Sequence, residues 1–106
     1  MGKTSREKGK RGEREFAEAL RELGVEARRG AQHRGGEGSP DVVTSLDGFH
    51  FEVKRTEKLS LWPSVEQAKR DAGQGVPVVA HRANRREWIA ILRLEDFVEL
   101  ALKASR

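Results

Sequence analysis

The chain has 106 residues, of which 36% are hydrophobic and 36% are charged, as expected for one small domain. It contains no cysteine, so disulfides and thiolate metal sites are excluded, and any bound metal must be held by oxygen or imidazole donors. No apolar run approaches the length of a membrane-spanning helix, about 18 residues, and the charged first residues lack the apolar core of a signal peptide. We therefore expect a cytoplasmic protein with no membrane partner.

The formal net charge is +4, and the whole excess lies in the first third of the chain. Ten Lys and Arg residues in positions 1–36 stand against six acidic residues. A basic surface of this kind suits phosphate groups and predicts salt-dependent binding, whereas a solvated basic tail is the alternative. We expect residues 1–9 to form a basic flexible arm and residues 10–106 to form the domain itself.

The pattern of apolar residues predicts three helices and five strands in the order αβββαββα. Apolar residues at helical spacing, followed by Gly24, indicate the first helix, and β-branched and aromatic residues indicate the strands. The glycine-rich stretch 30–38 is expected to be a loop. The predicted helices are 11–23, 64–72 and 94–103, and the predicted strands are 25–30, 41–46, 49–55, 76–81 and 88–93. We expect a small single-domain α/β fold in which helices flank a central mixed β-sheet.

Two local signals predict how these elements begin and connect. Asp47-Gly48 is a strong two-residue turn, so the strands 41–46 and 49–55 are expected to form an antiparallel hairpin. Ser64, followed three residues later by Gln67, fits a capping box at the start of the second helix. Gln67 has a second interpretation, in which it reaches from that helix toward the functional site.

Strand 49–55 reads FHFEVKR, and the alternation of its residues separates two faces. Its two Phe residues and its Val have the character of a core face. His50, Glu52 and Lys54 therefore project from the opposite face, where a single His is expected to be structural or a surface residue. Asp41 begins the neighbouring strand directly after Pro40, and this strand end places its carboxylate to share an ion with Glu52.

Glu13 lies on the apolar side of the first predicted helix. It precedes Phe16 by three residues and Ala17 by four, so it shares their stripe, which also includes Leu20 and Leu23. A carboxylate on a buried side must be paired, hydrogen-bonded or bound to metal. We therefore add Glu13 to the candidate site.

Together these side chains favour metal-dependent hydrolysis of phosphodiester bonds, with no small-molecule cofactor. Asp41 and Glu52 are expected to hold one or two Mg²⁺ ions, with Mn²⁺ as a substitute, and the Val53 main-chain carbonyl is a further candidate ligand. The ammonium of Lys54 is expected to orient the attacking water or to stabilise the pentacovalent phosphorus. The alternative is that the Glu-x-Lys triplet is an exposed ion pair, which is the more common use of such a triplet alone.

The segments GEREF, SPDVV and FEVKR together resemble the PD-(D/E)xK nuclease superfamily, and more closely the archaeal-type Holliday junction resolvases and their phage relatives. The matching positions are Gly9 or Gly12, Glu13-Arg14-Glu15-Phe16, Arg28 or Arg29, Pro40-Asp41-Val42-Val43 and Glu52-Val53-Lys54. The resemblance implies a restriction-endonuclease-like fold. It also implies metal-linked catalytic roles for four residues, Glu13, Asp41, Glu52 and Lys54.

The same resemblance implies a homodimer that cuts symmetrically opposed strands of a four-way DNA junction, because a two-fold enzyme matches a two-fold substrate. Such a nuclease serves DNA recombination and repair in the cytoplasm, or in the host cytoplasm where it is encoded by a phage. DNA contacts are expected from the basic first third of the chain and from the glycine-rich loop. The predicted DNA-binding residues are Lys10, Arg11, Arg14, Arg28, Arg29, His33 and Arg34.

Three questions stay open at this point. The family carries a serine-containing loop after the Arg-bearing strand, whereas the nearest hydroxyl here is that of Ser39, so the resemblance assigns no catalytic serine. Two other functions are possible: a general phage or restriction-type endonuclease acting on duplex, flap or nicked DNA, and a non-catalytic basic DNA-binding module. Candidates for an apolar pairing surface, all equally suited to the core, are Trp88, Ile89 and Ile91 or Phe97.

Overall fold

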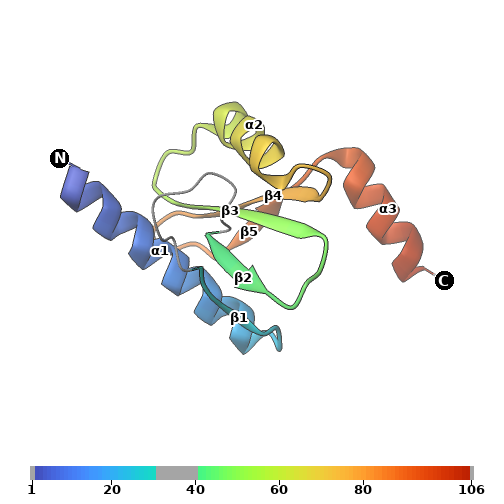
Figure 1. Ribbon diagram of the computed structural model, residues 1–106, viewed down its shortest axis with the longest axis horizontal. Coiled ribbons are helices and arrows are strands. Elements are labelled where there is room, and N and C mark those ends of the chain that lie inside the picture. The colour runs from blue at the N-terminus through green and yellow to red at the C-terminus, as the bar shows by residue number, and fades with distance from the viewer. Residues whose placement is uncertain (1, 31–40, 106) are drawn as a thin grey trace.

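Three helices and five strands make up the part of the chain that the computed structural model describes, residues 2–30 and 41–105. The helices are α1 (Gly2–Glu22), α2 (Leu61–Ala72) and α3 (Leu94–Ala104). The strands are β1 (Ala27–Arg29), β2 (Val42–Thr44), β3 (Phe49–Arg55), β4 (Val76–Arg82) and β5 (Ile89–Ile91). The element order is the predicted αβββαββα, and the expected small α/β fold is confirmed (Figure 1).

The strands form two sheets. In the larger sheet β3 runs parallel to β4, with Phe49 opposite Val76, and β4 runs antiparallel to β5, which gives the expected mixed sheet. Because β3 and β4 are parallel, the chain must cross over between them, and α2 forms this crossover. β1 and β2 form a separate antiparallel pair, with Arg28 opposite Val43. α1 packs against β1 and β3, while α2 packs against β3 and β4, so β3 lies between the two helices (Figure 1).

The predicted hairpin between β2 and β3 is wrong. The backbone of β2 pairs with β1 and that of β3 pairs with β4, so the described residues contain no ladder between β2 and β3. Asp47 and Gly48 do form a turn, in which Gly48 has a φ of 85°. The Gly48 carbonyl accepts a hydrogen bond of 2.7 Å from the Val76 amide, so this turn joins β3 to the start of β4 instead of folding it back along β2.

Two helices begin earlier than predicted. α1 already includes residues 2–9, expected to form a flexible arm, because these residues include the good helix formers Lys, Arg and Glu and no proline. α2 begins at Leu61 instead of Ser64, and Pro63 lies in its first turn, where a proline is tolerated. Ser64 is buried inside the helix and its hydroxyl donates to the Ser60 carbonyl at 2.7 Å, so the predicted capping box does not form.

The hydrophobic core forms between α1 and the strands. The ring centroid of Phe16 lies 5.3 Å from that of Phe51 and 5.0 Å from that of Trp88. Ala17 and Leu20 belong to the same buried cluster, as predicted, whereas Leu23 is 80% exposed because it lies beyond the end of the helix. Burial of this apolar surface is the main force that holds α1 against β3, and it thereby sets the position of every residue on α1.

Helix α3 extends from the end of the molecule opposite the start of α1 (Figure 1). Its only buried residue is Asp96, which accepts a hydrogen bond of 2.8 Å from Arg93, and most of its large apolar side chains are exposed. These exposed side chains are Leu94, Phe97, Val98, Leu100 and Leu102. None of the helices in residues 2–30 and 41–105 has the length and apolar character needed to cross a membrane.

Candidate active site

Strand β3 has the two faces that its sequence predicts. Phe49, Phe51 and Val53 pack against the hydrophobic core. Glu52 does not belong to that cluster, yet it is also buried, with only 3% of its surface exposed. A carboxylate with so little water around it needs hydrogen-bonding partners or a cation, because burying an unpaired charge is costly.

Glu52 stands between two side chains of its own strand. Its Oε2 lies 3.6 Å from Nζ of Lys54, and its Oε1 lies 3.8 Å from Nε2 of His50. The Lys54 ammonium also donates a hydrogen bond of 3.3 Å to Oε1 of Gln67, which lies on α2. Gln67 therefore reaches the site, in agreement with the second of its two interpretations, and Lys54 is held from two sides.

Glu13 brings a second carboxylate to this place from α1. Its side chain is 13% exposed, and it accepts a hydrogen bond of 2.9 Å from Nε of Arg29. Burial raises the pKa of Glu13 above its usual 4.5; the contact with Arg29 opposes this increase, and the negative charge of Glu52 adds to it. The prediction that Glu13 faces inward is therefore confirmed, and its carboxylate lies within electrostatic reach of Glu52.

Arg28 and Arg29 have different environments on β1. Arg29 is partly buried and holds the Glu13 carboxylate, so its guanidinium already has an acidic partner. Arg28 is exposed, as the alternating burial along this short strand requires. Of the two candidates for a phosphate contact, Arg28 is therefore the more accessible. The other loop candidates, His33 and Arg34, lie outside the described residues, as do Ser39 and Pro40.

Asp41 lies directly before β2 and is partly buried. Its main-chain carbonyl accepts a hydrogen bond of 2.9 Å from the Gly30 amide, which ties the start of β2 to the end of β1. Its negative charge is one of those that raise the pKa of His50. Asp41 thus lies on the side of the molecule that holds His50, close enough for its charge to act on the site.

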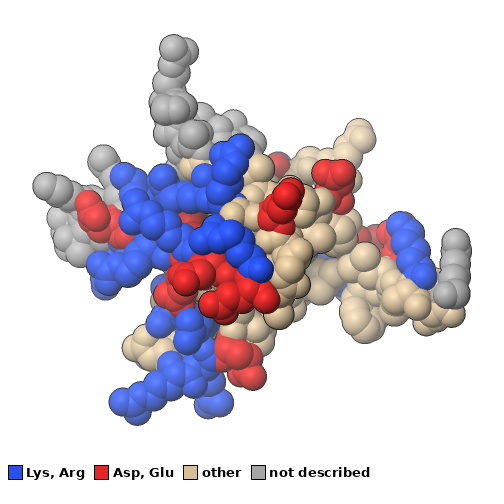
Figure 2. All heavy atoms as spheres, turned by 90° about the horizontal axis from the view of Figure 1, so that it is seen from below, with Lys and Arg blue, Asp and Glu red and all other residues tan. Residues whose placement is uncertain are grey.

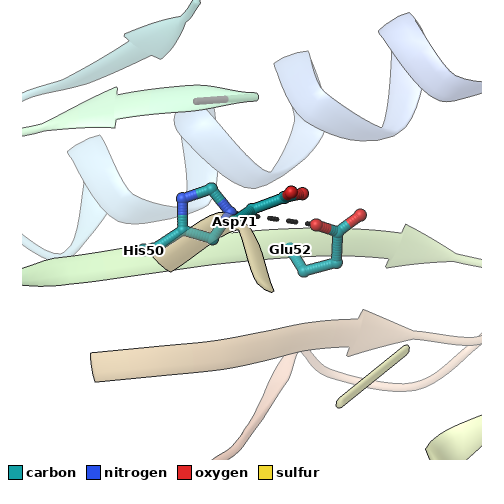
Figure 3. Close-up of side chains that lie close together, drawn as sticks. All are labelled: His50, Glu52 and Asp71. Atoms are coloured by element: carbon teal, nitrogen blue, oxygen red, sulfur yellow. Dashed lines mark ion pairs between the residues drawn. The ribbon is translucent and has the colours of Figure 1, made fainter. Parts of the chain in front are cut away.

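His50 and Asp71 join Glu52 in a group that the sequence interpretation missed. One ligand atom from each of the three residues lies within 4.8 Å of the other two (Figure 3). The contact with Glu52 raises the pKa of His50 above its usual 6.5, burial lowers it, and the charges of Glu52, Asp71 and Asp41 raise it further. Helical spacing is the signal that could have found Asp71. It follows Gln67 by four residues on α2 and so lies on the same face of the helix.

The site fits a divalent cation. Oε1 of Glu52 and Nε2 of His50 are both buried and have no hydrogen-bond partner among the described residues. Glu13 and Asp41 supply more negative charge nearby, and carboxylate oxygens are the donors that Mg²⁺ and Mn²⁺ prefer. A cation would satisfy a buried carboxylate oxygen that the protein leaves without a partner.

Basic side chains gather beside the site. Figure 2 shows Lys and Arg covering much of the half of the surface that lies toward the start of α1, around a smaller acidic group. Lys10, Arg11 and Arg14 are exposed on α1. Arg11 also lines a cleft with Arg55, whose Nε donates to Glu15 at 3.1 Å. This surface is suited to a polyanion, because exposed cations attract phosphate groups at long range.

Comparison with known proteins gives one clear result. A family model described as archaeal Holliday junction resolvase (Hjc) matches residues 4–100, which includes all of the residues assembled above. Neither the curated proteins nor the solved structures contain a match to this chain. Since the family match spans nearly the whole chain and agrees with the motifs on α1, β2 and β3, the chain belongs to the archaeal Holliday junction resolvase family.

Proposed function

We propose that this resolvase-family nuclease depends on a divalent metal ion, Mg²⁺ in the cell and Mn²⁺ as a substitute, and cuts four-way DNA junctions by paired, symmetric hydrolysis. One observation carries the metal dependence: Glu52 is 3% exposed, and its Oε1 has no hydrogen-bond partner in the described part of the chain. A charge buried in this way is costly unless a cation neutralises it.

The proposed ligands are Glu52, Asp41 and the main-chain carbonyl of Val53, with Glu13 bound directly or through water. When bound, the ion supplies Lewis acidity to the phosphoryl oxygens and lowers the pKa of a coordinated water. Arg29 holds the Glu13 carboxylate at 2.9 Å and thereby fixes its direction. Burial favours the protonated form of Glu13, which is a poor ligand, and the contact with Arg29 opposes this effect on the pKa.

Lys54 is the proposed electrophilic residue. Gln67 and Glu52 hold its ammonium from two sides, at 3.3 and 3.6 Å, so the charge is fixed before substrate binds. A preorganised cation of this kind stabilises negative charge as it develops on the phosphorus oxygens, or orients the attacking water. Gln67 acts through Lys54 and is therefore a positioning residue.

The proposed DNA-binding surface consists of the exposed cations on α1 and β1: Lys10, Arg11, Arg14 and Arg28. A homodimer is part of the proposal, because two sites are needed to cut two strands symmetrically. The exposed apolar side chains of α3, with Ile89 at 49% exposure on β5, favour this part of the chain as the pairing surface. Trp88, considered for the same role, instead packs on Phe16.

The test compares a synthetic four-way junction with a duplex of equal length, each incubated with Mg²⁺, with Mn²⁺ or with a chelator. We expect paired cuts at symmetric positions of the junction, only when either ion is present. Asp41→Asn and Glu52→Gln should abolish cleavage while the junction is still bound. Glu18→Gln, which changes an exposed acid on α1, is the matched control and should cut like the wild type.

Two results would contradict the proposal in different ways. Equal rates on junction and duplex would favour a general endonuclease. Binding without any cleavage in Mg²⁺ or Mn²⁺ would favour a DNA-binding module in which the acidic residues only form ion pairs.

A further inference from the structure

We propose that His50, Glu52 and Asp71 form a second cation position, which binds an imidazole-preferring divalent transition metal ion such as Zn²⁺. Glu52 would belong to both positions, with Oε1 toward His50 and Oε2 toward Lys54. The binding of Zn²⁺ by these three residues does not depend on the nuclease activity. Only the statement that Glu52 is shared with a catalytic ion rests on the proposed function.

The spacing of the ligand atoms supports this position. Nε2 of His50 lies 3.8 Å from Oε1 of Glu52, which is too long for a hydrogen bond. Two ligands bound to one Zn²⁺ at about 2.1 Å each, at the tetrahedral angle, are about 3.4 Å apart. The third ligand atom, from Asp71, completes a group in which all separations are below 4.8 Å. Side-chain rotations that bring the ligand atoms closer by roughly 0.4 to 1.4 Å would close this group around an ion.

The burial of these atoms, part of which also supports the proposed metal dependence, is a second indication of a ligand beside the spacing. The Glu52 side chain is only 4% exposed, and in Figure 3 its carboxylate points toward the side chains of His50 and Asp71. Oε1 of Glu52 and Nε2 of His50 are buried and lack hydrogen-bond partners among the residues that the structure describes. Two facing polar atoms left in this state are destabilising unless a third group lies between them.

The donor chemistry separates this position from the proposed catalytic one. Asp41, Glu52 and the Val53 carbonyl offer oxygen alone, which suits Mg²⁺. His50 adds an imidazole nitrogen, and a set of one imidazole and two carboxylates is a donor set that Zn²⁺ accepts. The ligands also come from two elements, since His50 and Glu52 lie on β3 and Asp71 lies near the end of α2, so an ion here would tie the helix to the strand.

The test uses the three histidines of the chain as reporters. The untagged, ¹⁵N-labelled full chain is titrated with Zn²⁺ in excess Mg²⁺, and the imidazole signals are followed by NMR while calorimetry measures the stoichiometry. We expect one Zn²⁺ per chain and a shift of the His50 signals. His81 is an internal control because its Nε2 already contacts the Thr56 carbonyl at 2.9 Å, so its signals should stay in place.

Variants assign the ligands. His50→Gln and Asp71→Asn should each weaken Zn²⁺ binding by at least tenfold. Glu66→Gln is the matched control, because Glu66 is exposed on the same helix and pairs with Lys69. It should bind Zn²⁺ like the wild type. In the wild type, Zn²⁺ should also raise the melting temperature, since an ion that binds only the folded state stabilises it.

The proposal fails if His50 signals do not move, if Zn²⁺ binds without Asp71 as tightly as with it, or if another histidine responds instead. Cleavage in Mg²⁺ without specific Zn²⁺ binding would overturn this inference and leave the proposed function intact. Specific Zn²⁺ binding by a protein that never cleaves DNA would support the position and overturn the proposed function.

Discussion

Replacement of Gly12 by alanine should disturb the candidate active site without changing any of its side chains. Gly12 lies on α1, directly before Glu13, and is buried against β3. A Cβ atom at this position would meet Cβ of Arg55 at 2.8 Å. Because the Arg55 Cβ is fixed to the strand backbone, rotation of the arginine side chain cannot relieve the contact. α1 and β3 must therefore move apart.

The magnitude follows from two opposing effects. The optimal separation of two non-bonded carbon atoms is about 3.5 to 4.0 Å, so α1 and β3 must separate by about 1 Å. Overpacking of this kind lowers the free energy of unfolding by about 1 to 3 kcal/mol, while the higher helix propensity of alanine raises it by about 0.5 to 1 kcal/mol. The net loss lowers the melting temperature by several degrees, since about 1 kcal/mol corresponds to 4–8 °C in a domain of similar size.

The same displacement moves Glu13 away from Glu52. A misplacement of about 1 Å in a catalytic constellation can reduce the rate by about 10²-fold, so junction cleavage should fall much more than junction binding. Thermal unfolding and single-turnover cleavage measure the two effects in the same preparation.

Gly9→Ala is the matched control, because it makes the same substitution on the same helix at a position where a Cβ meets nothing within 4 Å. It should stabilise the protein slightly and leave cleavage unchanged. If Gly12→Ala were as stable and as active as Gly9→Ala, the close packing of α1 on β3 would not be what positions Glu13.

Three further predictions concern charge and assembly. Folding favours the protonated form of Glu13, whose pKa is raised above 4.5 by burial, so this stabilisation is present at low pH and is lost as the pH rises through the raised value. Glu13→Gln should therefore match the wild type at pH 4 and exceed it in stability at pH 7, by urea unfolding. Arg28→Ala should weaken junction binding and reduce the slope of log affinity against log salt concentration by about 1. Equal slopes for this variant and the wild type would exclude a phosphate contact of Arg28. Arg29→Ala, in contrast, should chiefly reduce cleavage. Phe97→Ser should shift the proposed homodimer toward monomer in sedimentation, because Phe97 is 55% exposed on α3. A wild type and a variant of equal mass would exclude α3 as the pairing surface.

The parts of the site that were predictable are those governed by local periodicity. Alternation on β3 separates Glu52 from Phe51, and helical phase on α1 places Glu13 beside Phe16, because each pattern is set by the geometry of a single element. The predicted hairpin failed for the opposite reason. Which strand pairs with which depends on contacts between distant segments, and here the partner of β3 is β4, beyond a whole helix.

Two other features could not be predicted from local signals in the sequence. Ser64 has the residue type and spacing of a helix cap, yet the chain enters α2 three residues earlier and uses Ser64 inside the helix. Asp71 has no motif in the sequence and lies at the site only because α2 packs against β3 and β4. His50 and Glu52 were both visible on the polar face of β3, but their neighbour in space, Asp71, was not.

The parallel pairing of β3 and β4 through α2 affects the order in which the site residues come together during folding. His50, Glu52, Lys54, Gln67 and Asp71 all belong to this one strand–helix–strand unit, which is continuous in the sequence. Part of the proposed site can therefore assemble early, from contacts between residues close together along the chain, before Glu13 docks from the N-terminal helix and Asp41 from the start of β2. Hydrogen exchange should find β3 and β4 among the last amides to open and the exposed turns of α1 among the first. Glu13 lies just beyond the exposed positions 7–11 of α1, so fraying of this helix would reach the Glu13 carboxylate before the residues on β3 and α2, and cleavage would be a sensitive measure of that fraying.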